Sequence, residues 1–139
     1  MTYRRSLLLA LALALALSNV GPITAQQVHQ VEIEGNRDQG RFRFDPARIT
    51  VAPGDIVRFV VRSGQPHSVV FDSTGLAPAD KSALNDALPE RMSLLSGPIL
   101  TEEGQVFEIK VPRLSPGTYR FYCLPHRAYR AEGVMVVEG

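Results

Sequence analysis

Cysteine is nearly missing from this chain of 139 residues: Cys123 is the only one, and tryptophan is absent altogether. One cysteine cannot make an internal disulfide, which excludes the small secreted folds that disulfides hold together. An excess of either charge is also lacking, because 15 basic side chains nearly balance 14 acidic ones. This balance offers nucleic acid or an anionic membrane little electrostatic attraction, and we expect neither as a partner.

Catalytic side chains in their usual sets are lacking as well. The sequence shows no paired carboxylates, no Ser/His/Asp set and no glycine loop suited to cradle a phosphate. These are the groups that acid–base, nucleophilic and phosphoryl-transfer catalysis need. We therefore predict that the protein is not an enzyme.

Long hydrophobic runs are confined to one short stretch, Leu7–Leu17, which follows Arg4 and Arg5. A membrane-spanning helix needs about 20 apolar residues, so this run is too short to favour the alternative of an uncleaved anchor. A basic start, a short apolar run and small residues are typical of a secretory signal peptide. We predict a signal over residues 1–25, export to the periplasm or the exterior by the general or the twin-arginine route, and no membrane span after processing.

The remaining chain, residues 26–139, consists of short runs of alternating apolar residues separated by Gly, Pro, Asn and Asp. In the clearest run, Val57, Phe59 and Val61 fall on one face of a predicted strand over 56–61. Seven or eight such runs predict an all-β fold, an antiparallel β-sandwich in one domain. The predicted strands begin near Val28, Phe42, Ile49, Ile56, Val69, Gln105, Thr118 and Gly133.

One segment interrupts the strands. From Pro78 to Leu88 the sequence fits a short helix, because Leu84 and Leu88 are four residues apart and Pro89 would stop it. We expect a short helical insertion around residues 78–95.

The candidate chemistry lies near the end of the chain. Cys123 and His126 are three residues apart where a predicted strand ends, and Pro125 restricts the backbone between them. A third ligand must come from elsewhere, and His67, which follows Pro66 at a strand edge, is the candidate. Two imidazoles and one thiolate are the ligand set of blue-copper electron-transfer centres. The alternative is that all three are ordinary buried or loop residues.

Two stretches of the chain resemble the plastocyanin/azurin family of cupredoxins. The first reads Phe44-x-Pro46-x-x-Ile49-x-Val51-x-x-Gly54-Asp55-x-Val57-x-Phe59 and then Pro66-His67-x-Val69-x-Phe71. The second resembles the copper loop of plastocyanins and reads Pro116-Gly117-Thr118-Tyr119-x-Phe121-Tyr122-Cys123-x-Pro125-His126. The resemblance implies a Greek-key β-sandwich that binds one copper ion and carries single electrons.

Residue by residue, the resemblance implies that His67, Cys123 and His126 are the three equatorial copper ligands. The family's axial methionine, five residues after the second histidine, is replaced by Ala131. Glu132 and Met135 are weaker candidates for the axial position, which is otherwise open or filled by water. The family's asparagine after the first histidine is replaced by Ser68, whose hydroxyl can supply part of the same hydrogen bonding between loops.

The resemblance further implies how a partner would approach. Apolar residues surround His126, and a small apolar patch suits brief docking of transient redox proteins. Arg127 and Arg130 add positive charge there, which favours a partner with an acidic rim. Tyr122 is a candidate for a second exit of the electron. The expected patch contains Leu124, Pro125 and Ala128.

The leading hypothesis is therefore an exported electron shuttle that is a monomer. Three alternatives remain. An open fourth coordination position on the copper would suit a copper-binding or delivery protein. It would also suit an enzyme that binds a small molecule at this position. A metal-free domain used in protein contacts would instead leave the Cys123 thiol free to react.

Overall fold

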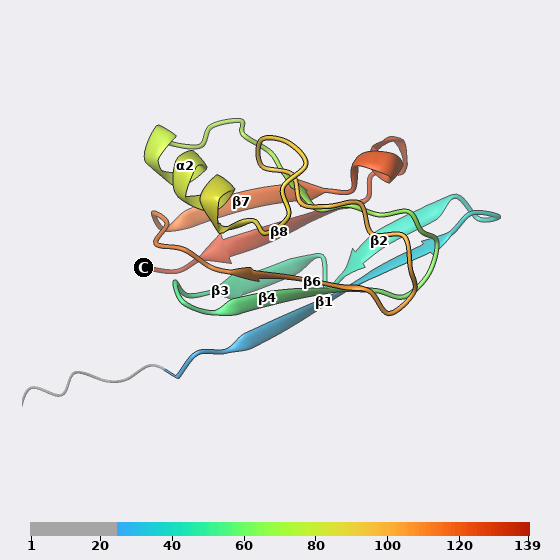
Figure 1. The fold of residues 1–139 in the computed structure, drawn as a ribbon, viewed down its shortest axis with the longest axis horizontal. Helices are drawn as coiled ribbons and strands as arrows, with labels where there is room; N and C mark the ends of the chain where they lie inside the picture. Colours follow the sequence, from blue (N-terminus) through green and yellow to red (C-terminus); the bar gives the residue numbers. More distant parts are fainter. Residues whose placement is uncertain (1–24) are drawn as a thin grey trace, which may run out of the picture.

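Alternating apolar side chains give each strand one buried face, and in the computed structural model, which describes residues 25–139, these faces pack into two layers (Figure 1). The first sheet has the order β2-β1-β4-β6 and the second β3-β8-β7-β5. The strands of the first sheet are β1 (Val28–Asn36), β2 (Arg41–Asp45), β4 (Ile56–Val61) and β6 (Val106–Lys110). Those of the second are β3 (Arg48–Val51), β5 (Val70–Phe71), β7 (Gly117–Tyr122) and β8 (Glu132–Val137).

The predicted β-sandwich is confirmed, but its pairing is mixed and not wholly antiparallel. β1 pairs parallel with β4, and β3 pairs parallel with β8. After β2 the chain crosses to the second sheet to form β3, then returns, so β4 enters the first sheet in the direction of β1. Side-chain alternation is the same in both pairings, and for that reason the sequence did not reveal the parallel pairs.

Apolar side chains from both sheets meet in one core. Val57, Phe59 and Val61 are fully buried, as the alternation predicted. Phe121 of β7 meets Phe44 and Phe59 of the opposite sheet edge-on, with ring centroids 4.9 and 5.4 Å apart. This aromatic cluster joins the two layers beneath the ends of the strands that lead to the candidate site.

The predicted insertion is helical only in its first half. Helix α2 (Pro78–Ala87) begins with proline in its first turn, and the carboxylate of its Asp80 accepts a hydrogen bond of 2.9 Å from the backbone N–H of Ser115. The helix ends because Leu88 is extended, the conformation that a following proline favours. Residues 88–95 form a loop, which corrects the predicted extent of the insertion.

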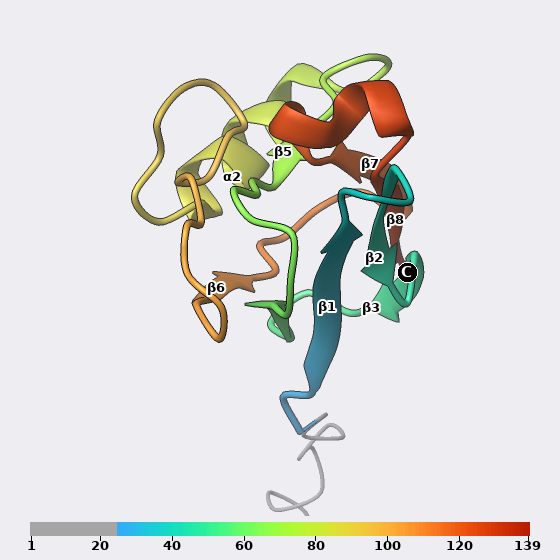
Figure 2. The ribbon, with the colours of Figure 1, turned by 90° about the vertical axis from the view of Figure 1, so that its right-hand side faces the viewer.

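A short 3₁₀ helix, η1 (Leu124–Tyr129), follows β7 where only a tight loop was expected. Figure 2 shows η1 at the same end of the sandwich as the turn between β1 and β2. The ring of Tyr129 lies beside Gly40 of that turn, with ring carbons within 3.7 Å of the position a side chain at Gly40 would occupy. No helix in residues 25–139 is long and apolar enough to cross a membrane. The predicted signal peptide lies, apart from Ala25, outside the described residues.

Candidate metal centre

The three predicted ligands come together at one end of the sandwich. His67 precedes β5, Cys123 follows β7 and His126 lies in η1. Their donor atoms lie within 4.8 Å of one another. The sulfur of Cys123 is 3.6 Å from Nδ1 of His67 and 3.4 Å from Nδ1 of His126. All three side chains are buried, so water has little access to the cluster.

Backbone hydrogen bonds hold the two loops that carry these residues. His67 exchanges two backbone hydrogen bonds of 2.8 Å with Leu100. The N–H of Cys123 donates to the carbonyl of Ala131 at 2.9 Å, which closes the loop that contains η1. The Ser68 hydroxyl accepts a hydrogen bond of 3.0 Å from the N–H of Leu124, the contact between loops that was predicted for it.

Each histidine is fixed by a different contact. Nε2 of His67 donates to the carbonyl of Ser63 at 2.7 Å, which places the ring proton on Nε2 and leaves the lone pair of Nδ1 facing the sulfur. The ring of His126 stacks on Phe42, with centroids 3.6 Å apart and planes 11° apart. Both imidazoles are therefore already oriented before a metal ion binds.

Burial also sets the protonation of the cluster. It lowers the pKa of His67, and it lowers the pKa of His126 to about 4, with the neighbouring His67 and Arg37 acting in the same direction. At neutral pH both rings are uncharged, the form that can donate a lone pair. Burial raises the pKa of the Cys123 thiol, although hydrogen bonds from Ser68 and His126 oppose this effect. The thiol must therefore lose its proton before its sulfur can bind a metal.

The donor set fits copper. Two neutral imidazole nitrogens and one thiolate sulfur, buried and convergent, are the equatorial donors of trigonal copper sites. No fourth histidine, cysteine or carboxylate joins the cluster among the residues that the structure describes. Ala131 is buried beside Cys123 and has no donor atom in its side chain.

The two weaker candidates for an axial ligand face away from the cluster. Met135 is buried in β8 opposite Ile49 and Tyr119, so it is a core residue. Glu132 is exposed on the outer face of β8 beside Tyr122.

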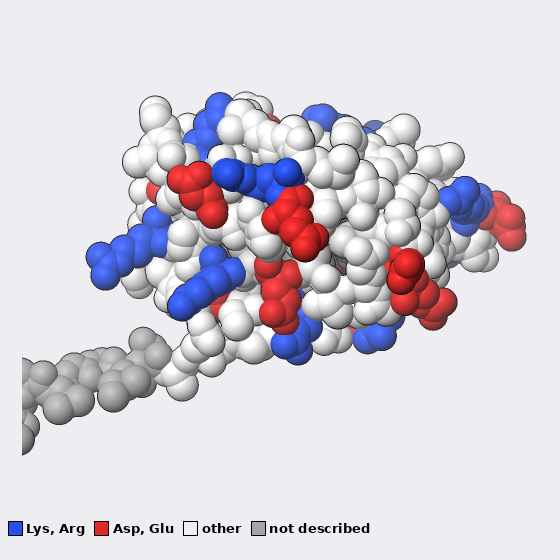
Figure 3. Space-filling view, viewed as in Figure 1, with Lys and Arg blue, Asp and Glu red and all other residues white. Residues whose placement is uncertain are grey.

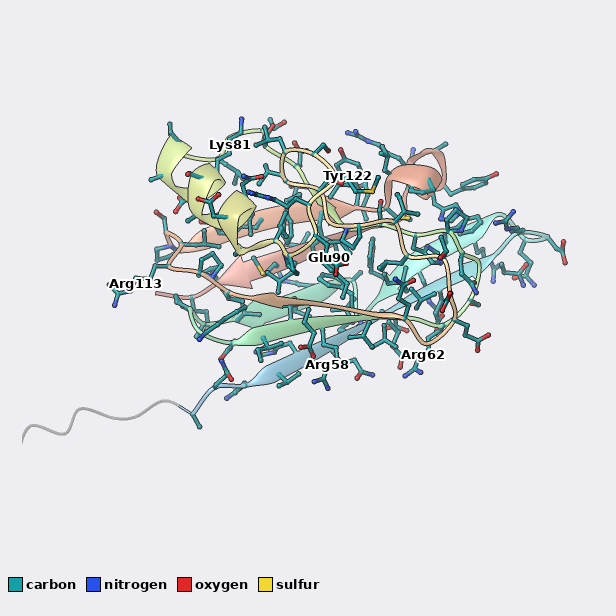
Figure 4. All side chains as sticks on the ribbon, in the orientation of Figure 1. Arg58, Arg62, Lys81, Glu90, Arg113 and Tyr122 are labelled. Carbon is teal, nitrogen blue, oxygen red and sulfur yellow. The ribbon has the colours of Figure 1, made fainter. Side chains whose placement is uncertain are left out.

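Tyr122 is the last residue of β7 and directly precedes Cys123; Figure 4 labels it on the outside of the second sheet. Burial alternates from Phe121 through Tyr122 to Cys123, so the tyrosine projects away from the core. The guanidinium carbon of Arg127 lies over its ring, 4.1 Å from the centroid. Tyr122 is thus partly covered by a positive charge.

Sequence reasoning missed three contacts of the site. Phe42 was assigned only to a strand, and Ser63 and Arg37 were not considered. Arg37 and Phe42 lie far from the cluster in sequence, and Ser63, four residues before His67, contacts it only through its backbone carbonyl, so no residue pattern connects these three to the cluster. The third histidine, His29, lies outside the cluster: it is half-buried, and its Nε2 is 2.8 Å from the Asp55 carboxylate.

The fold and the cluster together define a class, the cupredoxin-like β-sandwich with a mononuclear metal site. Residues 30–138 match the family described as copper binding proteins, plastocyanin/azurin family. The chain is 31% identical to a plastocyanin of Nostoc punctiforme over 98% of this chain and 94% of that protein. It is 35% identical to a plastocyanin of Dryopteris crassirhizoma over 77% of this chain and 99% of that protein. The solved structure of the oxidised Dryopteris protein covers 78% of this chain and 99% of its own, at a TM-score of 0.61 and 33% identity.

The chain therefore belongs to the plastocyanin/azurin family of copper-binding proteins, and its cofactor is copper. A purple cupredoxin from Nitrosopumilus maritimus, at 19% identity and a TM-score of 0.55, shares the fold.

Proposed function

We propose that this protein is an exported carrier of single electrons that holds one copper ion through Nδ1 of His67, Sγ of Cys123 and Nδ1 of His126. The observation that supports it best is the convergence of these three donor atoms within 4.8 Å, all buried. Copper, when bound, supplies a one-electron couple between Cu(I) and Cu(II). In this proposal the mature protein consists of residues 26–139 and is located in the periplasm or outside the cell.

The surrounding residues suit this role because they are already in place. Fast electron transfer requires that the ligands move little between the two oxidation states. The Ser63 carbonyl holds His67, the Phe42 ring holds His126, and the Ser68 hydroxyl ties the η1 loop to the His67 loop. A preformed and dry ligand set keeps the reorganisation small.

His126 is the ligand closest to solvent. Its side chain is 6% exposed, whereas His67 and Cys123 are fully buried. Leu124, Pro125 and Ala128 surround it and are exposed, which provides the predicted apolar patch. The route for the electron in this proposal is the His126 edge, with transient protein partners docking there and the chain acting as a monomer.

Copper delivery is a second candidate, favoured by Ala131. A donor-free side chain in the place of the family's methionine weakens the hold on the metal, which would help copper to exchange. The experiment that separates the two functions starts from the copper-loaded protein. A shuttle shows reversible one-electron voltammetry and keeps Cu(I) in the presence of a moderate Cu(I) chelator. A delivery protein loses Cu(I) to the chelator within the same time.

A further inference from the structure

The end of β1 packs against the loop that leads to His67. Gly35 approaches Gly64 of that loop so closely that a side-chain carbon built on Gly35 would lie 3.0 Å from Cα of Gly64. The N–H of Gly35 donates a hydrogen bond of 3.1 Å to the hydroxyl of Ser63. Ser63 also orients His67, because its carbonyl accepts the hydrogen bond from the ring. The β1–β2 turn, residues 37–40, therefore begins beside the loop of a copper ligand.

Arg37 bridges the turn and this loop. Its guanidinium donates to the backbone carbonyl of Gln65, two residues before His67. Figure 3 shows basic and acidic side chains side by side at the tip of this hairpin, where the turn carries Arg37 and Asp38. Arg37 forms no ion pair with Asp38 or with another carboxylate of residues 25–139. One positive charge is therefore held on the His67 loop, with no carboxylate in contact to neutralise it.

The charge of Arg37 acts on both histidines of the cluster. Burial is the largest cause of the lowered pKa of His67 and of His126, and the guanidinium of Arg37 lowers both further. A charge that disfavours a proton on these rings also disfavours added positive charge on a metal that they bind. With the same ligands, Cu(II) carries one more positive charge than Cu(I). A positive charge at this place therefore destabilises Cu(II) more than Cu(I).

We propose that Arg37 raises the reduction potential of the copper: held on the His67 loop, its guanidinium keeps a positive charge beside the ligands and favours Cu(I). This inference rests on the proposed function and its ligand set, and it adds a residue outside that set which shifts the balance between the two oxidation states. Because Arg37 is exposed and water screens its charge, the expected effect is modest.

The test measures the one-electron equilibrium between the copper-loaded protein and hydroxymethylferrocene. In this reaction Cu(II) becomes Cu(I) and the ferrocene iron goes from Fe(II) to Fe(III), with no proton transferred. Arg37→Gln should lower the equilibrium constant for reduction of Cu(II) about three-fold at low salt. This difference should largely disappear at about 1 M salt, where the screening length is about 3 Å.

Two variants serve as controls. Arg37→Lys keeps the charge and should keep most of the wild-type constant. Arg113→Gln removes an exposed positive charge at the opposite end of the molecule, labelled in Figure 4, and should leave the constant nearly unchanged. An unchanged constant in Arg37→Gln, an equal loss in Arg37→Lys, or a loss that persists at high salt would overturn the proposal.

NMR of the metal-free protein shows whether Arg37→Gln disturbs the site itself. The proton on Nε2 of His67 should still exchange slowly with water in this variant, because its bond to the Ser63 carbonyl does not depend on the charge. Fast exchange of this proton in Arg37→Gln would overturn the electrostatic explanation, since the ligand would then have lost its orientation.

Measured affinities separate this inference from the proposed function. Competition with chelators gives the Cu(I) and Cu(II) affinities of each variant without any electron transfer between proteins. Arg37→Gln should strengthen the binding of Cu(II) about three-fold relative to that of Cu(I). This change in ratio without a reversible one-electron couple would contradict only the electron carrier. A reversible couple whose potential is the same with and without the Arg37 charge would contradict only the inference about Arg37.

Discussion

Replacing Phe42 by leucine tests how His126 is held. Phe42 is 7% exposed and stacks on His126 with ring centroids 3.6 Å apart. Leucine keeps the site apolar, so the change in side-chain shape should cost about 1 kcal/mol of unfolding free energy. Loss of the aromatic pair adds about 1 kcal/mol. We therefore expect Phe42→Leu to destabilise the metal-free protein by about 2 kcal/mol.

Phe107→Leu is the matched control for this prediction. Phe107 is similarly buried, at 4% exposure. Its ring does not stack on Phe59, because the two ring centroids are 6.2 Å apart and the planes are tilted. Urea unfolding of the two metal-free variants should differ by about 1 kcal/mol, the contribution of the stack. The ring-proton NMR signals of His126 should move downfield in Phe42→Leu only, because the neighbouring ring current is lost. Equal destabilisation with unmoved His126 signals would refute the reasoning.

Three further predictions follow from hydrogen bonds and close packing. Burial alone would raise the pKa of Asp55, but the hydrogen bonds that its carboxylate accepts lower this pKa. Asp55→Asn should therefore reduce the free energy of unfolding by about 2 kcal/mol above pH about 4. This cost should shrink as pH falls through the lowered pKa, which urea titrations at several pH values would measure, and a pH-independent cost would contradict it. Ser68→Ala removes the acceptor for the N–H of Leu124 and should cost about 1 kcal/mol, with faster hydrogen exchange at that amide; unchanged exchange would count against the contact. Gly133→Ala should unfold at lower urea by about 2 kcal/mol or more, because its new carbon would lie 2.4 Å from the ring of Phe121, and a wild-type midpoint would show that the ring can move aside.

The strands and the cluster were within reach of sequence reasoning because their signals are local. Val57, Phe59 and Val61 alternate with a period of two, which determines their buried face whatever the partner strand. Cys123 and His126 are close in sequence at a strand end, so their convergence follows from a short loop. The parallel pairs depend on where the chain crosses between sheets, and no side-chain pattern records that.

The contacts that position the histidines were out of reach for a related reason. Phe42 is remote from His126 in the chain, and its apolar character predicts burial but not which ring it meets. The carbonyl of Ser63 is a backbone atom, so residue type carries no information about its bond to His67. The end of α2 at Ala87, by contrast, could have been read more closely, because Pro89 disfavours a helical Leu88.

The measurement that tests the central claim most directly is the visible and electron paramagnetic resonance spectrum of the mature protein titrated with Cu(II). With His67, Cys123 and His126 as ligands, we predict an intense thiolate-to-copper charge-transfer band that saturates at one copper per chain. The band should vanish in Cys123→Ser, while Met135→Leu and Glu132→Gln should keep it. No such band in the wild type, with the Cys123 thiol still titrating freely, would contradict the assignment of the copper ligands.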